Sequence, residues 1–119
     1  MFINENWKEF ILKHGAIIED DVIKQFSDKP EELTNAKSGN IITDLSHYGL
    51  ISVDGEDAES FLQNQFSNDV RLVTETHSQL SAYCSPKGRM LAGFQVFKRG
   101  NTFYLRLPAS ILQSTLKRL

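Results

Sequence analysis

The sequence predicts an α+β fold in which helices pack on a mostly antiparallel sheet. From about residue 50 onward, short apolar segments follow the order strand, helix, three strands, helix. Two of the connections, Ser85-Pro86-Lys87-Gly88 and Gly100-Asn101, have the composition of tight turns, which join antiparallel neighbours. With 119 residues in total, the economical packing places the helices on one face of the sheet.

The individual elements follow from apolar periodicity. Residues 50–53 predict a short strand that ends at Asp54-Gly55, and a helix is expected from about Asp57. Strands are expected over residues 79–84, 90–98 and 102–107, and Pro108 is expected to open a last helix. Because residues 90–98 are apolar on both faces, we expect this strand near the centre of the sheet.

Residues 1–40 predict an amphipathic arm followed by a connector. The arm has one apolar stripe at helical spacing, formed by Trp7, Phe10, Ile11 and His14. Asn4 or Asn6 is expected to cap this helix, and Gly15 to end it. Residues 16–26 fit short strands around an acidic turn, and residues 27–40 are predicted to form a loop.

The formal net charge of −2 hides an uneven distribution. The chain has 13 Lys and Arg against 15 Asp and Glu, and all 15 acids lie in residues 1–75. Residues 76–119 contain seven bases and no acid. This split indicates either an anionic partner for the second part, or basic side chains that pair with the first part or face solvent.

Composition excludes several classes of protein. No apolar run approaches the roughly 18 residues of a membrane span, so we expect no membrane partner. The first residues lack the pattern of a signal peptide, and we expect a cytoplasmic protein. The single cysteine, Cys84, excludes an internal disulfide framework, and no Cys/His spacing predicts a zinc site.

Few residues suggest chemistry by themselves. Asp44, His47 and Cys84 are the ingredients for nucleophilic catalysis, but a lone cysteine in an apolar strand is more often a small core residue. Lys87-Gly88-Arg89 forms either an anion-binding turn or a solvated hairpin tip. We assign no catalytic residue.

The last residues, Leu116 to Leu119, lie inside a helical pattern without a stop signal. Either the domain ends on a helix, or the chain is the N-terminal piece of a longer protein. We expect the second.

Three segments in fixed order carry a resemblance to a known family. They are Asp44-Leu45-Ser46-His47-Tyr48-Gly49, the stretch from Val53-Asp54-Gly55 to Asn68-Asp69-Val70, and Tyr83-Cys84-Ser85-Pro86-Lys87-Gly88-Arg89-Met90. Over residues 41–119 the chain resembles the N-terminal part of the folate-binding domain of the aminomethyltransferase (glycine cleavage T-protein) superfamily. The Lys-Gly-Arg-Met ending is more similar to the YgfZ branch.

The resemblance implies a function. T-proteins carry a pair of acids where this chain has Ala92 and Gly93, which argues against aminomethyl transfer. YgfZ-type proteins bind tetrahydrofolate-like compounds and are implicated in iron–sulfur enzyme maintenance and in tRNA modification. Their Lys-Gly-Cys-Tyr-Thr-Gly-Gln-Glu signature lies beyond the residues present here. A divergent aminomethyltransferase and a non-catalytic RNA-contacting domain are the alternatives.

The resemblance also implies candidate folate-binding residues: Tyr48, Asn68, Asp69, Tyr83, Lys87 and Arg89. Tyr48 matches a position that lines the pterin pocket in relatives, and the two cations are expected to attract the glutamate tail. The alternative for Asn68 and Asp69 is a structural role, in which they mark the end of a helix. Because the missing C-terminal part would supply half of the pocket, we expect weak folate binding, or none, by these 119 residues alone.

Overall fold

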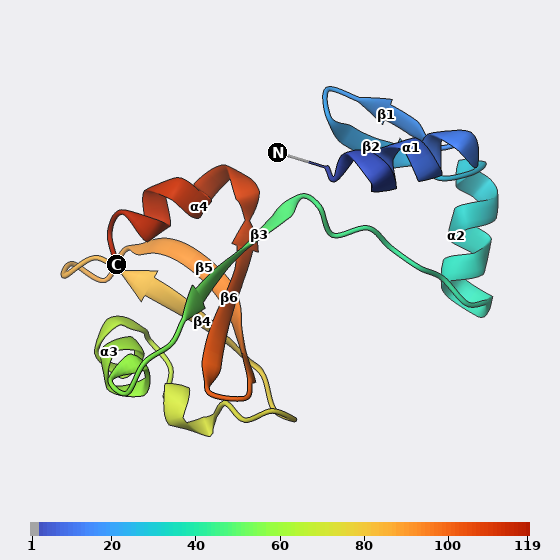
Figure 1. Cartoon of the computed structure of the whole chain (residues 1–119). Helices are drawn as coiled ribbons and strands as arrows, with labels where there is room; N and C mark the ends of the chain where they lie inside the picture. The colour runs from blue at the N-terminus through green and yellow to red at the C-terminus, as the bar shows by residue number, and fades with distance from the viewer. Residues whose placement is uncertain (1–2) are drawn as a thin grey trace. The chain divides into compact units, whose positions relative to one another are not determined.

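The computed structural model describes residues 3–119. Its contacts divide the chain into two compact units, of which the first ends at His47 and the second is Tyr48–Leu119. Figure 1 shows the helices and strands of both units. None of the described helices is long and apolar enough to cross a membrane.

The first unit contains two helices and a small hairpin: α1 (Glu5–Lys13), β1 (Ile17–Glu19), β2 (Val22–Gln25) and α2 (Lys29–Ser38). Asn4 caps α1, because its side-chain Oδ1 accepts a hydrogen bond from the Trp7 amide at 3.2 Å. The hairpin turns at Asp20 and Asp21, which both have positive φ, a conformation that aspartate tolerates better than most residues. The predicted arm helix and acidic turn are confirmed.

The predicted loop over residues 27–40 is wrong, since most of it forms α2. This helix has no apolar stripe and buries no residue, so periodicity gave no sign of it. Its start is set instead by a proline in the first turn, followed by Glu31 and Glu32. The Glu32 carboxylate also accepts hydrogen bonds from the amides of Phe26 and Ser27, at 2.7 and 2.8 Å.

The second unit confirms the predicted α+β fold. Its elements are β3 (Tyr48–Val53), α3 (Ala58–Gln65), the 3-10 turn η1 (Val70–Leu72), β4 (Gln79–Cys84), β5 (Met90–Arg99), β6 (Thr102–Pro108) and α4 (Ala109–Leu116). The strands form one antiparallel sheet in the order β3-β6-β5-β4. As expected, β5 is an inner strand. Pro108 precedes the first residue of α4, one position earlier than predicted.

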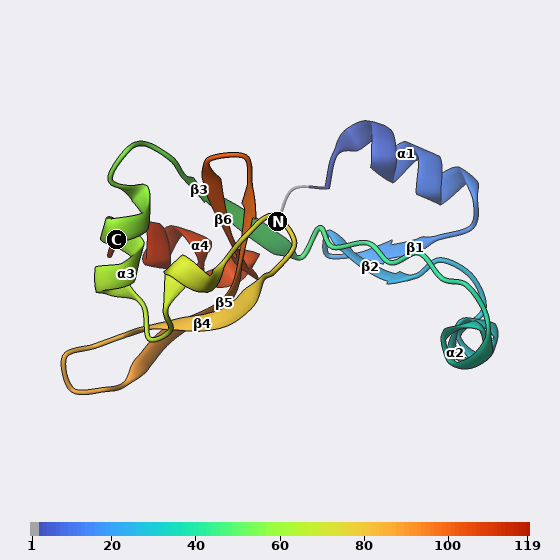
Figure 2. The ribbon, with the colours of Figure 1, turned by 90° about the horizontal axis from the view of Figure 1, so that it is seen from below.

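Alternation along the strands gives the sheet two different faces. One face packs against α3 and α4, which lie on the same side of the sheet (Figures 1 and 2). Leu62 of α3 and Leu105 and Leu107 of β6 are fully buried there. The core also includes Ile51, Ala58, Phe66, Val70, Val73, Ala92, Phe94, Val96 and Phe103.

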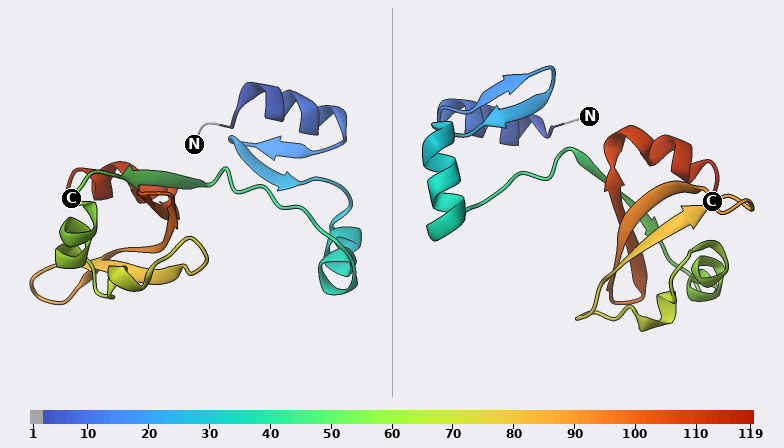
Figure 3. Two further views of the ribbon diagram at one scale, coloured as in Figure 1. Left: turned by 60° about the horizontal axis from the view of Figure 1, so that its bottom comes forward. Right: turned by 180° about the vertical axis from the view of Figure 1, so that it is seen from behind.

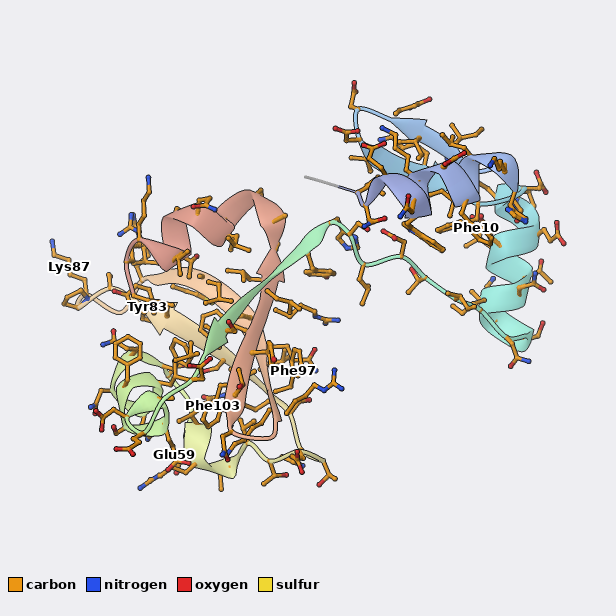
Figure 4. The ribbon with its side chains drawn as sticks, viewed as in Figure 1. Phe10, Glu59, Tyr83, Lys87, Phe97 and Phe103 are labelled. Carbon is orange, nitrogen blue, oxygen red and sulfur yellow. The ribbon has the colours of Figure 1, made fainter. Side chains whose placement is uncertain are left out.

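The opposite face, which we call the open face, carries the alternate residues of the same strands. Leu50 is 56% exposed and Leu80 is 74% exposed. Phe97 stacks on Tyr104, with 5.3 Å between the ring centroids. Figure 4 shows Phe97 on the side of β6 away from the helices, and Phe103 on the helix side. The second unit therefore presents one face of its sheet without a covering layer of its own.

Candidate functional site

A hollow of about 370 Å³ lies on the open face, over all four strands. Tyr48 of β3, Leu80 of β4, Gly93 and Gln95 of β5, and Arg106 and Pro108 of β6 line it, together with Ser81 and Phe94. Ser81 and Phe94 are buried on the core side. The other residues alternate with buried core residues, so the pleat of the sheet fixes their direction. The hollow is open to solvent, and its lining combines apolar and aromatic side chains with a few polar groups.

Arg106 supplies the only formal charge in this hollow. It pairs with Leu50 on one side and Gln95 on the other, in the centre of the sheet. Its guanidinium lies over the Tyr48 ring, with Cζ 4.7 Å from the ring centroid, a cation–π geometry. Its Nε is buried and has no hydrogen-bond acceptor among the described residues.

Gly93 lines the hollow without contributing a side chain to it. A Cβ at this position would meet only the Met90 sulfur, at 3.7 Å, so side-chain space here is open. At the two positions where the resemblance implies an acid pair in T-proteins, this chain has Ala92 and Gly93. Ala92 is buried on the helix side, and Gly93 lies at the hollow, which therefore contains no carboxylate.

Among the residues predicted from the family resemblance, Tyr48 lies at this hollow. Asn68 is on the segment beside β4, where its side-chain Nδ2 donates to the Leu80 carbonyl at 2.6 Å. Asp69 caps η1 and accepts a hydrogen bond from the Arg71 amide at 3.0 Å. Both residues hold the α3–η1 connection on the edge of the sheet.

Asp69 is also engaged by the Arg71 side chain. Arg71 Nε and Nη2 donate to the two carboxylate oxygens of Asp69, each at 2.8 Å. This side-chain hydrogen bond holds the pKa of Asp69 below its ordinary value of 3.8 and raises the pKa of Arg71. Both carboxylate oxygens are thus used within the protein.

Tyr83 lies on the helix side of the sheet, facing away from Tyr48. It packs against the core, and its hydroxyl donates to the Arg118 carbonyl at 3.4 Å. The structure therefore does not bring Tyr83 and Tyr48 to one pocket.

Lys87 and Arg89 are exposed in the β4–β5 hairpin turn. The Ser85 amide donates to the Arg89 carbonyl at 2.8 Å, and the Gly88 amide donates to the Ser85 carbonyl at 2.8 Å. Gly88 has a φ of 80°, which glycine adopts without strain. Figures 3 and 4 show this turn extending beyond the sheet, with Lys87 at its tip.

Asp44 and His47 belong to the first unit, and Cys84 to the second. Asp44 Oδ2 accepts a hydrogen bond from Trp7 Nε1 at 2.7 Å, and Oδ1 accepts one from the Ser46 amide at 2.8 Å. Asp44 therefore orders its own segment against α1. Within residues 3–119, no group of three His, Cys, Asp or Glu side chains could hold a metal ion.

Arg106 and Gln95 were not among the residues selected from the sequence. The alternation over residues 102–107 places Thr102, Tyr104 and Arg106 on one face. That pattern alone could have marked Arg106 as a residue of the non-core face. It could not show that Tyr48 lies beside it, because this depends on the register between β3 and β6.

The fold defines a class: an α+β protein whose antiparallel sheet carries helices on one face and an open hollow on the other. The chain matches no protein-family model. It is 32% identical over 78 residues to the tRNA-modifying protein YgfZ of Colwellia psychrerythraea, covering 66% of this chain and 24% of that protein. It is 35% identical over 81 residues to an aminomethyltransferase of Staphylococcus epidermidis, covering 68% of this chain and 22% of that protein.

A protein of Haemophilus influenzae called uncharacterized is 41% identical over 76 residues, which is 63% of this chain and 27% of that protein. These similarities make the chain a member of the superfamily that contains the YgfZ proteins and the aminomethyltransferases. The chain spans about a quarter of the length of the curated relatives it matches.

Proposed function

We propose that this chain is the N-terminal part of a YgfZ-type protein and that the hollow on the open face contributes to a tetrahydrofolate site. The observation that carries the proposal is the position of Tyr48. The family resemblance marks this residue for the pterin pocket, and it lines the hollow together with Gly93 and Arg106. A hollow of about 370 Å³ accommodates part of a folate, and a further part of the whole protein would enclose the rest.

In the same proposal, residues 41–119 are the N-terminal portion of the folate-binding domain, and residues 1–40 are an arm that precedes it. The protein acts in the cytoplasm, supports iron–sulfur enzymes and takes part in tRNA modification. Asn68, Asp69 and Tyr83 support the sheet from behind or beside the hollow. Lys87 and Arg89 attract an anionic ligand from the hairpin tip.

Aminomethyl transfer is the second candidate, since relatives with that activity in their name match 68% of the chain. It requires a carboxylate or an equivalent group near the ligand. Ala92 and Gly93 supply none, so a different group of the whole protein would have to act. On this account Ala92→Asp has little effect on glycine cleavage by the full-length protein. Folate-dependent glycine cleavage by that protein would favour this candidate, and its absence would remove it.

The test of the first candidate is calorimetric titration with 5-formyltetrahydrofolate. Gly93→Leu fills the hollow, and Ala82→Leu is the matched control, because Ala82 pairs with Gly93 on the same face without lining the hollow. In the full-length protein we expect binding that Gly93→Leu abolishes and Ala82→Leu preserves; the 119 residues alone are expected to bind weakly or not at all. Equal binding by both variants, or none by the parent chain and the full-length protein, contradicts the proposal. A downstream coding sequence without the Lys-Gly-Cys motif contradicts the YgfZ assignment.

A further inference from the structure

We infer that Arg106 is a positioning residue of the folate site, which acts through Tyr48 and does not bind the ligand itself. Its guanidinium holds the Tyr48 ring in the orientation in which the ring meets a pterin. The inference deepens the proposed function and rests on it for the identity of the ligand. The contact between the two side chains lies within this chain, so it can also be tested without a ligand.

The first argument is that the sheet holds Arg106 in place. Arg106 lies on β6, an inner strand, between Leu50 of β3 and Gln95 of β5. Its side chain is half-buried, and its Nε is enclosed by the protein without an acceptor among the described residues. Because Nε cannot reach an incoming ligand, this burial favours a role through a neighbouring side chain.

The second argument is the weaker support of the Tyr48 backbone. Tyr48 is the first residue of β3, and β3 is an edge strand of the sheet. Its partner across the ladder is Pro108, which has no N–H to donate to the Tyr48 carbonyl. Side-chain contacts therefore contribute more to the orientation of this ring than they would in the middle of an inner strand.

The third argument is the chemistry of the contact. Arg106 Cζ lies 4.7 Å from the centroid of the Tyr48 ring, where the negative face of the ring attracts the cation. The hollow is lined by no acidic residue, and the ion pairs among residues 3–119 do not include Arg106. No carboxylate at the hollow therefore competes with the ring for this guanidinium.

The orientation of the Tyr48 ring matters for a bound pterin. A pterin is planar, and aromatic rings prefer a limited set of offset-stacked or edge-to-face arrangements. A tyrosine whose ring is held before the ligand arrives loses less conformational entropy on binding. Arg106 should therefore raise the affinity for the pterin through Tyr48.

The first measurement is nuclear magnetic resonance of the chain without ligand. We expect nuclear Overhauser effects between the Arg106 side chain and the Tyr48 ring. Arg106→Gln should shift the Tyr48 ring signals, and the matched control Arg99→Gln should leave them unchanged. Arg99 alternates onto the same face of β5, pairs with Thr102 and does not line the hollow. Absence of the Overhauser effects in the parent overturns the inference, whether or not Arg106→Gln folds.

The second measurement is calorimetric titration of the full-length protein with 5-formyltetrahydrofolate and with 6-hydroxymethylpterin, which has no glutamate tail. We expect Arg106→Gln to weaken both by about two- to fivefold, the range of a cation–π contact at a partly exposed site, and Arg99→Gln to weaken neither. In a Tyr48→Leu background, Arg106→Gln should reduce the affinity no further.

Three results of this titration overturn the inference. They are an unchanged affinity in Arg106→Gln, a loss for the folate without a loss for the pterin, and an equal loss when Tyr48 is already replaced by leucine. The second result would mean that Arg106 acts on the glutamate tail, and the third that it acts without Tyr48.

The outcomes also separate the inference from the proposed function. Folate binding that ignores Arg106→Gln would contradict the inference and support the folate proposal. No folate binding by the full-length protein would contradict the proposed function. The Tyr48 ring signals would then decide whether Arg106 orients the ring.

Discussion

The guanidinium of Arg106 lies over the ring of Tyr48, with 4.7 Å between Cζ and the ring centroid. The two residues come from the adjacent strands β6 and β3, and both line the hollow on the open face. The family resemblance selected Tyr48, and the structure places Arg106 beside it.

The contact predicts a measurable coupling between the two side chains. In a double-mutant cycle of Tyr48→Leu and Arg106→Gln, we expect a coupling free energy of about 0.5–1 kcal/mol, as for a cation–π pair at a partly exposed site. Urea unfolding of the four proteins measures it. A coupling indistinguishable from zero would mean that the side chains do not interact in solution.

We expect truncation of a leucine side chain to lower the unfolding free energy by different amounts on the two faces of the sheet. Leu105 is fully buried and Leu50 is 56% exposed, so Leu105→Ala should cost about 2–5 kcal/mol of unfolding free energy. Leu50→Ala should cost less than about 1 kcal/mol. Chemical unfolding distinguishes these cases. Similar losses at both positions would indicate that the open face is covered as deeply as the core.

Because of the ion pair between Asp69 and Arg71, we expect the stability of the protein to depend on pH in the acid range. The hydrogen bond from Arg71 lowers the pKa of folded Asp69 below 3.8, so its stabilising effect is complete above the unfolded pKa and is lost as the pH falls through the folded one. The melting temperature of Asp69→Asn should therefore lie slightly below that of the parent at pH 7, and the difference should shrink below about pH 4. A difference that is constant from pH 7 to pH 2 would rule out the ion pair as its source.

Trp7 is the single tryptophan, and it donates to Asp44 at 2.7 Å. Asp44→Ala should therefore red-shift the fluorescence and increase quenching by acrylamide. It should also destabilise the first unit by about 1.5–3 kcal/mol, the value of a hydrogen bond to a charged group. Asp28→Ala is the control, since the Asp28 side chain makes no cap hydrogen bond. If both variants leave the emission unchanged, Asp44 does not hold the tryptophan.

The helices and strands that were predicted correctly are those whose apolar residues recur at a regular spacing. The strands of the second unit and the arm helix follow from spacing and turn residues, because burial of one face imposes that spacing. The helix α2 buries nothing and has no such period. Its signal was the proline and the two glutamates of its first turn.

The site was harder to predict than the fold. Tyr48 was found through a family pattern, whereas Arg106 follows only from the register in which β6 pairs with β3 and β5. Tyr83 neighbours the basic turn in sequence, yet the pleat directs it to the helix side. A single sequence does not contain strand register, and the register decides which side chains meet.

The central claim is that the open face of the sheet contributes to a folate site. The most direct test is a titration of the isotope-labelled chain with 5-formyltetrahydrofolate, followed through its amide resonances. Our account predicts saturable shifts at Gly93, Gln95 and Arg106, with small changes at Tyr83 and Lys87. Shifts confined to the helix side or to the hairpin turn, or none at any soluble ligand concentration for either this chain or the full-length protein, would contradict it.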